Sequence, residues 1–288
     1  MARSKLNIVK SSGDRVVYDE DKLRNSLSFS GASASIIGSI IKRINGLLYP
    51  SITTEEIYDL AYEMLMEHSS FYGARYKIKK ALFELGPSGF PFEKYINELL
   101  IREGFTTELN QFLVGQCISH EIDILAQKKD SLYLVECKFH SDRTRVCNVK
   151  DPLYLQSRFT DVVNGFDTQK KQQYQSIKQW VVTNTRFTKD AIDYARCCHM
   201  KLISWNYPLD FSLKILVDKH QLYPITTLSS LSQDEKQQLL QMDVVLCSQL
   251  NKDRGILDKI GLSDTRIDRV VEECRFVCYL STNGSIKH

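Results

Sequence analysis

Three charged residues interrupt two apolar runs between positions 120 and 140, where the sequence reads HEIDILAQKKDSLYLVECKFH. Asp123 lies in the first run, Glu136 and Lys138 lie in the second, and a polar stretch separates the two. Side chains alternate between the faces of a strand, so we expect Glu136 and Lys138 to project to the same side. Two adjacent strands would bring Asp123 and Glu136 to one divalent cation. Their hard oxygen atoms suit Mg²⁺, which combines one or two carboxylates with water and substrate phosphate.

Lys138 would lie one pleat along, beside a metal-bound water or an attacked phosphate. A metal ion lowers the pKa of bound water and stabilises charge on phosphoryl oxygens, and a lysine adds a further positive charge. The alternative is a surface hairpin with scattered charges, but its apolar residues leave neither face clearly solvated. Because burying unpaired charges is costly, we favour a functional site. The apolar residues are Ile122, Ile124, Leu134, Val135 and Phe139.

The elements around this hairpin predict an α/β or α+β domain. A helix precedes the hairpin, with apolar residues 92, 95, 96, 99 and 100 on one face. Strand-like runs read NQFLVGQCI, QWVVTNT and KLISW, and helices are predicted at DPLYLQSRFTDVV and TKDAIDYARCC. The glycines and prolines of LGPSGFP (85–91) mark a domain boundary. We therefore expect this domain to span residues 87–220.

The spacing of Asp123 from Glu136-Cys137-Lys138 resembles the D-(x)n-E-x-K core of the PD-(D/E)XK nuclease superfamily, nearest to the Mrr-like restriction endonucleases. In that family a glutamate on the preceding helix follows a G-x-x-F pattern, and GFPFEKYINELL supplies Glu93 in this place. WVVTNTRFTKDAIDYA also resembles a later segment of the family. The resemblance covers about residues 88–215 and implies a restriction-endonuclease-like mixed sheet flanked by helices.

The same resemblance implies a set of functional residues. Asp123, Glu136 and the backbone carbonyl of Cys137 would bind Mg²⁺ or Mn²⁺. Lys138 would orient the attacking water, and Glu93 would assist the metal or its water shell. The implied activity is that of a metal-dependent DNA endonuclease, an enzyme that hydrolyses phosphodiester bonds, with a role in restriction or defence.

Four polar residues near this core have open roles. HEID places Glu121 where many relatives have a glycine, which leaves it as an extra metal or phosphate-side group. His120 and His140 flank the site, and such histidines are more often structural, although either could contact phosphate. Arg158 lies on the next predicted helix and could face the scissile strand.

Residues 1–86 read as two short strands followed by four helices, without a Walker A pattern. LNIVK and RVVYD flank the turn SSGD, and Thr53 and Glu56 form a capping-box pattern before the third helix. The segment IVKSSGDRVVYDEDKLRNSLSFSGA resembles the opening of the ATP-cone, a regulatory nucleotide-binding domain. The residues that follow its pattern are Val9, Lys10, Gly13, Arg15, Tyr18, Lys22 and Leu23.

That second resemblance implies ATP or dATP as a regulatory ligand. A nucleotide triphosphate needs several converging cationic donors, which Lys10, Arg15 and Lys22 could provide. The alternative is that these three are ordinary surface cations.

Residues 221–288 read as a C-terminal segment of short helices, with a capping box at Ser232 and Glu235. Within it, LDKIGLSDTRIDRVVEEC (257–274) places two helical pieces on either side of Gly261. This loosely resembles a helix-hairpin-helix, and a small helical packing module is an equal alternative.

Properties of the whole chain set wider limits. Its 288 residues have room for two or three domains, and a net charge of +3 permits nucleic-acid binding without demanding it. The start shows no secretory pattern, and no stretch approaches the length of an apolar membrane span. The eight cysteines form no C-x-x-C pair, so we expect reduced thiols in a cytoplasm rather than a structural zinc site.

Together these features predict a cytoplasmic, nucleotide-regulated and metal-dependent DNA endonuclease. Its expected partners are DNA and ATP or dATP, with no membrane, and a homodimer is plausible because double-strand cutting generally needs two active sites. A catalytically silent, nucleotide-responsive module that binds DNA is the main alternative. Activity on RNA or branched DNA is a third.

Overall fold

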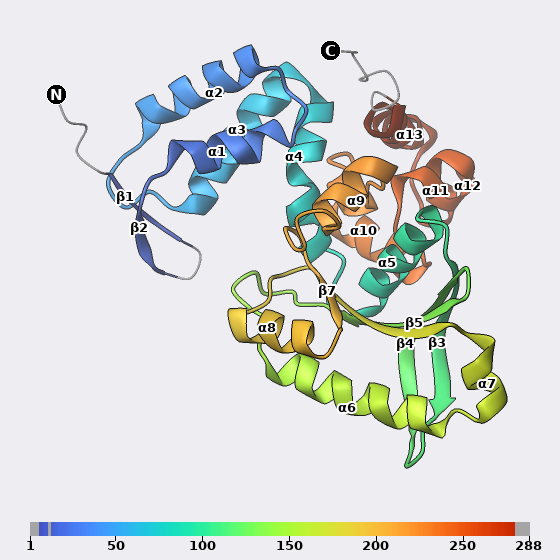
Figure 1. Cartoon of the computed structure of the whole chain (residues 1–288). Coiled ribbons are helices and arrows are strands. Elements are labelled where there is room, and N and C mark those ends of the chain that lie inside the picture. The colour runs from blue at the N-terminus through green and yellow to red at the C-terminus, as the bar shows by residue number, and fades with distance from the viewer. Residues whose placement is uncertain (1–5, 11–12, 280–288) are drawn as a thin grey trace. The chain divides into compact units, whose positions relative to one another are not determined.

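The computed structural model describes residues 6–10 and 13–279 (Figure 1). Ser11 and Ser12, in the predicted turn SSGD, and residues 280–288 of the predicted C-terminal segment lie outside this part. The chain divides into two compact units. The first comprises Met1–Ala81, Thr227–Glu235 and Cys247–His288, and the second comprises Leu82–Thr226 and Lys236–Leu246. The division into 1–86, 87–220 and 221–288 remains a prediction.

The N-terminal part of the first unit is a small hairpin followed by helices. Strand β1 (Asn7–Val9) pairs antiparallel with β2 (Arg15–Val17). The helices are α1 (Glu20–Ser28), α2 (Ala34–Leu47), α3 (Thr54–His68) and α4 (Ser70–Phe83). The predicted capping box at Thr53 is confirmed, because its hydroxyl accepts the Glu56 N–H at 3.0 Å and its own N–H donates to the Glu56 carboxylate at 2.8 Å.

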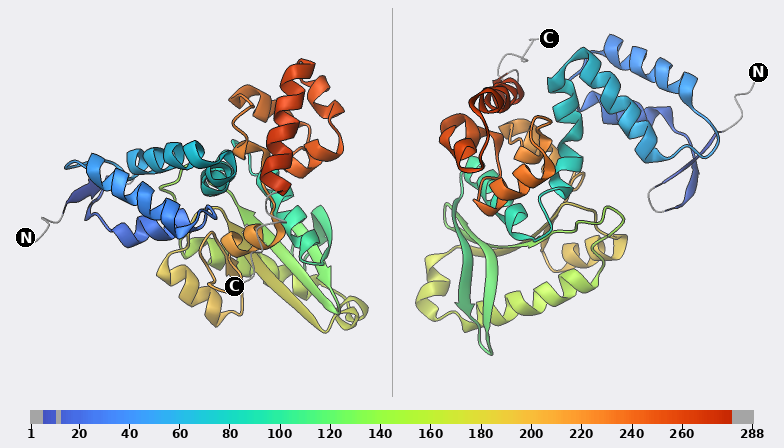
Figure 2. Two further views of the ribbon diagram at one scale, coloured as in Figure 1. Left: turned by 90° about the horizontal axis from the view of Figure 1, so that it is seen from above. Right: turned by 180° about the vertical axis from the view of Figure 1, so that it is seen from behind.

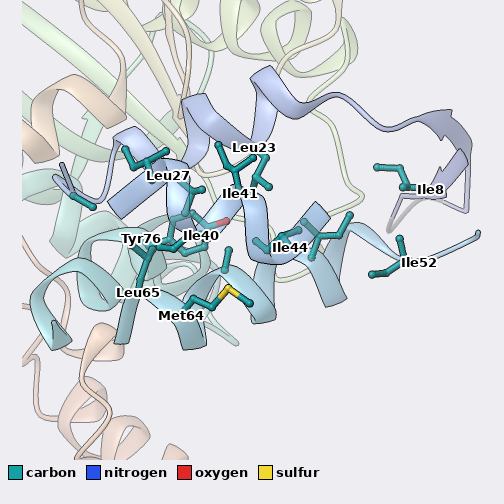
Figure 3. Packing of buried hydrophobic residues seen from close by; sticks show 14 residues of the cluster. Ile8, Leu23, Leu27, Ile40, Ile41, Ile44, Ile52, Met64, Leu65 and Tyr76 are labelled. Atoms are coloured by element: carbon teal, nitrogen blue, oxygen red, sulfur yellow. The ribbon is translucent and has the colours of Figure 1, made fainter. Parts of the chain in front are cut away.

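The apolar faces of these helices form one core (Figure 3). Leu27, Ile40, Ile44 and Leu65 are completely buried there. They come from α1, α2 and α3, at the three- and four-residue spacing that gives a helix one apolar face. The sequence pattern of residues 20–68 thus accounts for this core.

The C-terminal part of the first unit is helical, as predicted. Its helices are α10 (Gln233–Gln241, shared with the second unit), α11 (Cys247–Lys252), α12 (Gly255–Lys259) and α13 (Asp264–Tyr279). The expected capping box at Ser232 forms, since its N–H donates to the Glu235 carboxylate at 2.8 Å. Gly261 separates α12 from α13 with φ +78°, a left-handed conformation that glycine adopts without strain.

The second unit is built on a five-stranded mixed sheet, which confirms the expected restriction-endonuclease-like fold class. The strand order is β3-β4-β5-β6-β7, antiparallel from β3 to β5 and parallel from β5 to β7. The strands are β3 (Thr106–Val114), β4 (Ser119–Lys128), β5 (Ser131–Lys138), β6 (Ser176–Thr183) and β7 (Lys201–Ile203). The first strand begins earlier than the run NQFLVGQCI suggested, because its Thr106–Leu109 half pairs with β4.

Helices cover both faces of this sheet (Figures 1 and 2). They are α5 (Phe90–Arg102), α6 (Lys150–Gly165), α7 (Thr168–Gln173), α8 (Lys189–Cys197) and α9 (Leu213–His220), with a 3₁₀ turn at Ile225–Thr227 after them. Leu132 and Leu134 of β5 pack with Val162 and Phe166 on the α6 side. Since β5 is covered on both faces, it is almost wholly buried.

None of the helices in the described part of the chain is long and apolar enough to cross a membrane.

The end of α6 meets the β3–β4 turn without room for another atom. A Cβ added at Gly165 would lie 2.4 Å from the carbonyl carbon of Gly115. We expect Gly165→Ala to lower the free energy of unfolding of the second unit by about 1–3 kcal/mol, the usual cost of overpacking. Urea unfolding followed by tryptophan fluorescence measures this, since both tryptophans, Trp180 and Trp205, lie in that unit.

The exposed neighbour Asn164 offers a matched control. Asn164→Ala should leave the midpoint of unfolding unchanged or slightly raised, because alanine has the higher helix propensity. Equal midpoints for the two variants would contradict the tight contact at Gly165.

Candidate active site

Asp123 and Glu136 lie where the β4–β5 ladder ends. The last residue pair of that ladder is Ile124 with Val135, so the next residues along each strand are Asp123 and Glu136. The N–H of Cys137 donates to the Asp123 Oδ2 across this gap, at 2.6 Å. The predicted proximity of the two carboxylates is therefore observed, and the charge of Asp123 acts on Glu136.

Glu136 is a buried carboxylate with only part of its hydrogen-bonding capacity used. It is 4% exposed, and its Oε2 accepts from Arg158 Nη1 at 2.9 Å and lies 3.7 Å from Lys138 Nζ. Its Oε1 is buried without a hydrogen-bond partner in the described part of the chain. Burial and then the charge of Asp123 raise the pKa of Glu136 to about 7, against the opposing effect of the two cations. A cation beside Oε1 would favour the ionised form.

The pKa of Asp123 is also raised. Burial raises its pKa, while the Cys137 N–H and the charges of Lys138 and Arg158 lower it. The Cys137 thiol is buried, and burial together with neighbouring carboxylates raises its pKa well above the usual value.

Glu93 reaches the same place from α5. Burial, followed by the charge of Asp123, raises the pKa of Glu93. Its Oε2 accepts from Asn110 Nδ2 at 3.5 Å. Asn110 has φ 50° and lies between the β3–β4 pairs Leu109–Ile124 and Gln111–Ile122, directly opposite Asp123. The sequence pattern did not predict a left-handed residue here. The one signal for it is that an asparagine, which tolerates this conformation, occurs in a strand-like run.

Arg158 contacts residues of both β4 and β5 at the site. Besides Glu136, its guanidinium donates to the backbone oxygen of Glu121, and it lies 5.6 Å from the centre of the Tyr154 ring. The Glu121 side chain itself is exposed. The fork geometry of arginine lets one side chain connect α6, β4 and β5.

The two flanking histidines have structural partners. His120 Nε2 lies 2.8 Å from Asp161 Oδ2, and that carboxylate also accepts the N–H groups of Cys117 and Ile118. His140 Nε2 lies 3.3 Å from the Cys147 thiol. These contacts favour a structural role for both histidines.

The donor set suits a hard divalent cation. No group of three or more His, Cys, Asp or Glu side chains arranged to hold a metal occurs among residues 6–10 and 13–279. Mg²⁺ does not require such a group, since it usually keeps several waters and takes one or two carboxylates. The unpartnered Glu136 Oε1 and the adjacent Asp123 carboxylate fit that mode of binding.

In the first unit, two of the three predicted nucleotide-binding cations line one cavity of about 250 Å³. Lys10 and Lys22 are among its lining residues, together with Ile8 and Val16. Arg15 is not among them. It pairs with Val9, one residue along from the Ile8–Val16 pair, so its side chain belongs to the other face of the hairpin.

Three family models match successive parts of the chain. Residues 87–207 match the model described as restriction endonuclease, residues 6–81 match the ATP cone domain, and residues 223–278 match the model described as AF1548-like, C-terminal. An uncharacterized protein of Archaeoglobus fulgidus is 32% identical over 180 residues, which cover 62% of this chain and 97% of that protein. The chain therefore contains an ATP cone domain, a restriction endonuclease domain and an AF1548-like C-terminal domain, and it belongs to the same family as this Archaeoglobus fulgidus protein. Its ATP-cone and nuclease domains are arranged in the predicted order.

A solved structure is similar to this chain as well. The crystal structure of the protein of unknown function AF1548 superimposes with a TM-score of 0.55 and 30% sequence identity, covering 66% of this chain and 98% of that one. The domain indicates a nuclease-type hydrolase, and the ATP cone indicates nucleotide binding.

Burial of Glu136 should make the restriction endonuclease domain less stable at neutral pH than at acidic pH. The folded-state pKa of about 7 exceeds the ordinary value of 4.5, so the native state binds the proton more tightly. Stability is then highest below pH 4.5 on this account, falls as the pH rises to about 7, and levels off above it. The free energy of unfolding should fall by up to roughly 3 kcal/mol across this pH range.

Glu136→Gln should reduce that loss when urea unfolding is measured in EDTA at several values between pH 5 and 8, and the remainder is expected from Asp123 and Glu93, whose pKa values are also raised. Glu108→Gln, an exposed change on β3, serves as the control and should leave the pH profile intact. A wild-type profile that stays flat from pH 5 to 8 would show that Glu136 titrates normally.

Proposed function

We propose that the protein is a nucleotide-regulated, metal-dependent endonuclease that hydrolyses phosphodiester bonds in DNA. One observation carries this proposal. The buried Glu136 carboxylate has a free oxygen beside Asp123, with Lys138 and Arg158 adjacent. An anionic pair with two cations beside it suits a metal and a phosphate bound together.

Asp123, Glu136 and the Cys137 carbonyl would hold Mg²⁺ or Mn²⁺, which when bound supplies charge stabilisation and a more acidic water. Lys138 is 30% exposed at its side chain, so its ammonium reaches solvent at the edge of the site. There it can orient a water or neutralise a phosphate oxygen. Arg158 holds Glu136 in position and is already engaged by it.

Glu93 is proposed to assist the water shell of the cation. Its raised pKa means that it accepts a proton more readily than a solvent-exposed glutamate. Asn110 fixes one of its oxygens.

A homodimer would provide two such sites for cutting both strands of a duplex. The expected setting is a cytoplasm, where DNA and nucleotide triphosphates occur together, and the restriction endonuclease domain supports a role in restriction or defence. A catalytically silent, nucleotide-responsive DNA-binding module is the second candidate.

Cleavage assays separate an enzyme from a silent module. With Mg²⁺ or Mn²⁺ and plasmid DNA, we expect Asp123→Asn and Lys138→Ala each to lower the rate of cleavage at least about 100-fold. The first removes a charged ligand of the cation, and the second removes a positive charge beside the reacting phosphate. Lys189→Ala, an exposed change on α8, should retain the wild-type rate. The assay is run with and without ATP, and on RNA and branched DNA.

Binding of DNA without cleavage in either metal would support the silent module instead. Cleavage confined to RNA or branched DNA would support the same active site but a different substrate.

Nucleotide binding is tested separately in the first unit. Lys10→Ala and Lys22→Ala should each weaken ATP or dATP binding about tenfold or more, the effect of losing one charge-assisted hydrogen bond. Isothermal titration measures the affinity, and Lys42→Ala on the exposed face of α2 is the control. The same titration of Arg15→Ala tests the third predicted cation. Unchanged affinity in the Lys10 and Lys22 variants would show that this cavity does not bind the nucleotide.

A further inference from the structure

A second concave site lies in the restriction endonuclease domain, where β5 and β6 begin. Its volume is about 410 Å³, and four lysines line it. Lys128 ends β4, Lys129 lies in the following turn, Lys178 belongs to β6, and Lys201 begins β7. Residues 73 positions apart in the sequence thus bring their charges to one pocket.

This pocket is separate from the candidate active site. Tyr133 of β5 lines it, whereas Glu136 contacts Arg158 on the α6 side. Odd and even residues of β5 point to opposite faces. Tyr133 is three residues from Glu136, which is roughly 10 Å at the usual rise of a strand, and it points to the other face of the sheet.

Aromatic rings form the base of the pocket. Phe105, Tyr133, Trp180 and Phe211 pack edge to face, with centroid separations between 4.9 and 5.6 Å. Trp180 and Phe105 are almost completely buried. The rings therefore make an aromatic floor for the pocket.

Three lysines are held against these rings. The ammonium of Lys201 lies 3.6 Å from the centroid of Phe211 and 4.7 Å from that of Trp180. Lys178 lies 5.1 Å from the Tyr133 ring, and Lys128 lies 4.8 Å from the Phe105 ring. Cation–π contacts position the ammonium groups but leave their positive charge uncompensated.

Carboxylates of the described chain do not neutralise this group of lysines. Within residues 6–10 and 13–279, none of the four forms an ion pair with a carboxylate. Glu103, which also lines the pocket, is engaged by Lys219 at 2.6 Å and His220 at 2.5 Å. Asp130 is the other lining carboxylate, and the charges of Asp210 and Glu103 act on Lys201 without forming an ion pair with it. Burial nevertheless lowers the pKa of Lys201, an effect that a bound anion would oppose.

We propose that this pocket is a second, non-catalytic site that binds the phosphate groups of a nucleotide, either free or within a nucleic-acid strand. Several lysines converging on one concavity attract phosphate as point charges. The volume lies within the usual range for small-ligand sites. The inference does not depend on hydrolysis at Asp123 and Glu136.

The test uses the full-length protein in EDTA, with AMP, ATP, a short single-stranded oligonucleotide and inorganic phosphate as probes. A Trp205→Phe background leaves Trp180, in the floor of the pocket, as the one tryptophan of the chain. Fluorescence titration then reports occupancy of this pocket. We expect saturable quenching by a nucleotide probe, and an affinity at least about tenfold lower in Lys178→Ala/Lys201→Ala.

Two controls keep the result interpretable. Lys189→Ala should bind as the parent does, and Lys178→Arg/Lys201→Arg should restore most of the affinity because it retains both charges. Urea midpoints for every variant show whether the domain is still folded.

The probes also identify the source of the phosphate. Tighter binding of the oligonucleotide, with a salt dependence that weakens by about two in the slope of log K for the double alanine variant, identifies a nucleic-acid strand. Tighter binding of AMP or ATP identifies a free nucleotide. Equal affinity in parent and double alanine variant, or weak binding of inorganic phosphate with no preference for nucleotides, would overturn the proposal.

Discussion

The cost of burying the Glu136 carboxylate is the constraint on which the candidate site depends. It lies beside a second carboxylate, Asp123, with one oxygen satisfied by Arg158 and the other unpartnered. Partial compensation leaves the pKa of Glu136 near 7, so the charge is available at neutral pH but is not fully stabilised by the protein. A bound cation is the chemical complement of such a group, which links the electrostatics of the folded domain to its proposed activity.

The position of the candidate site follows from where the hydrogen-bonded pairing of the strands is interrupted. The β4–β5 ladder ends at Ile124 and Val135, and Asn110 adopts a left-handed conformation opposite Asp123. These two irregularities interrupt the regular strand pairing at Asp123, while no residue of β5 is exposed. Arg158 on α6 then connects the carboxylate to the helix that closes one side.

Charge is used differently at three places in the chain. At the candidate active site, cations accompany buried carboxylates. In the ATP-cone, Lys10 and Lys22 line a small cavity. At the opposite end of the sheet, Lys178 and Lys201 rest on aromatic rings without carboxylate partners. A modest net charge of +3 conceals these local concentrations, because potentials depend on where charges gather rather than on their sum.

The sequence by itself determined the spacing of Asp123, Glu136 and Lys138, because the two-residue period of a strand decides which side chains share a face. It also indicated the helices of the first unit, since their apolar spacing is local. Only the tertiary structure decided that Arg158 pairs with Glu136, that Asn110 faces Asp123, and that the pocket lysines converge. Those contacts join residues that are far apart in the sequence, and their geometry depends on how strands and helices pack rather than on any local pattern.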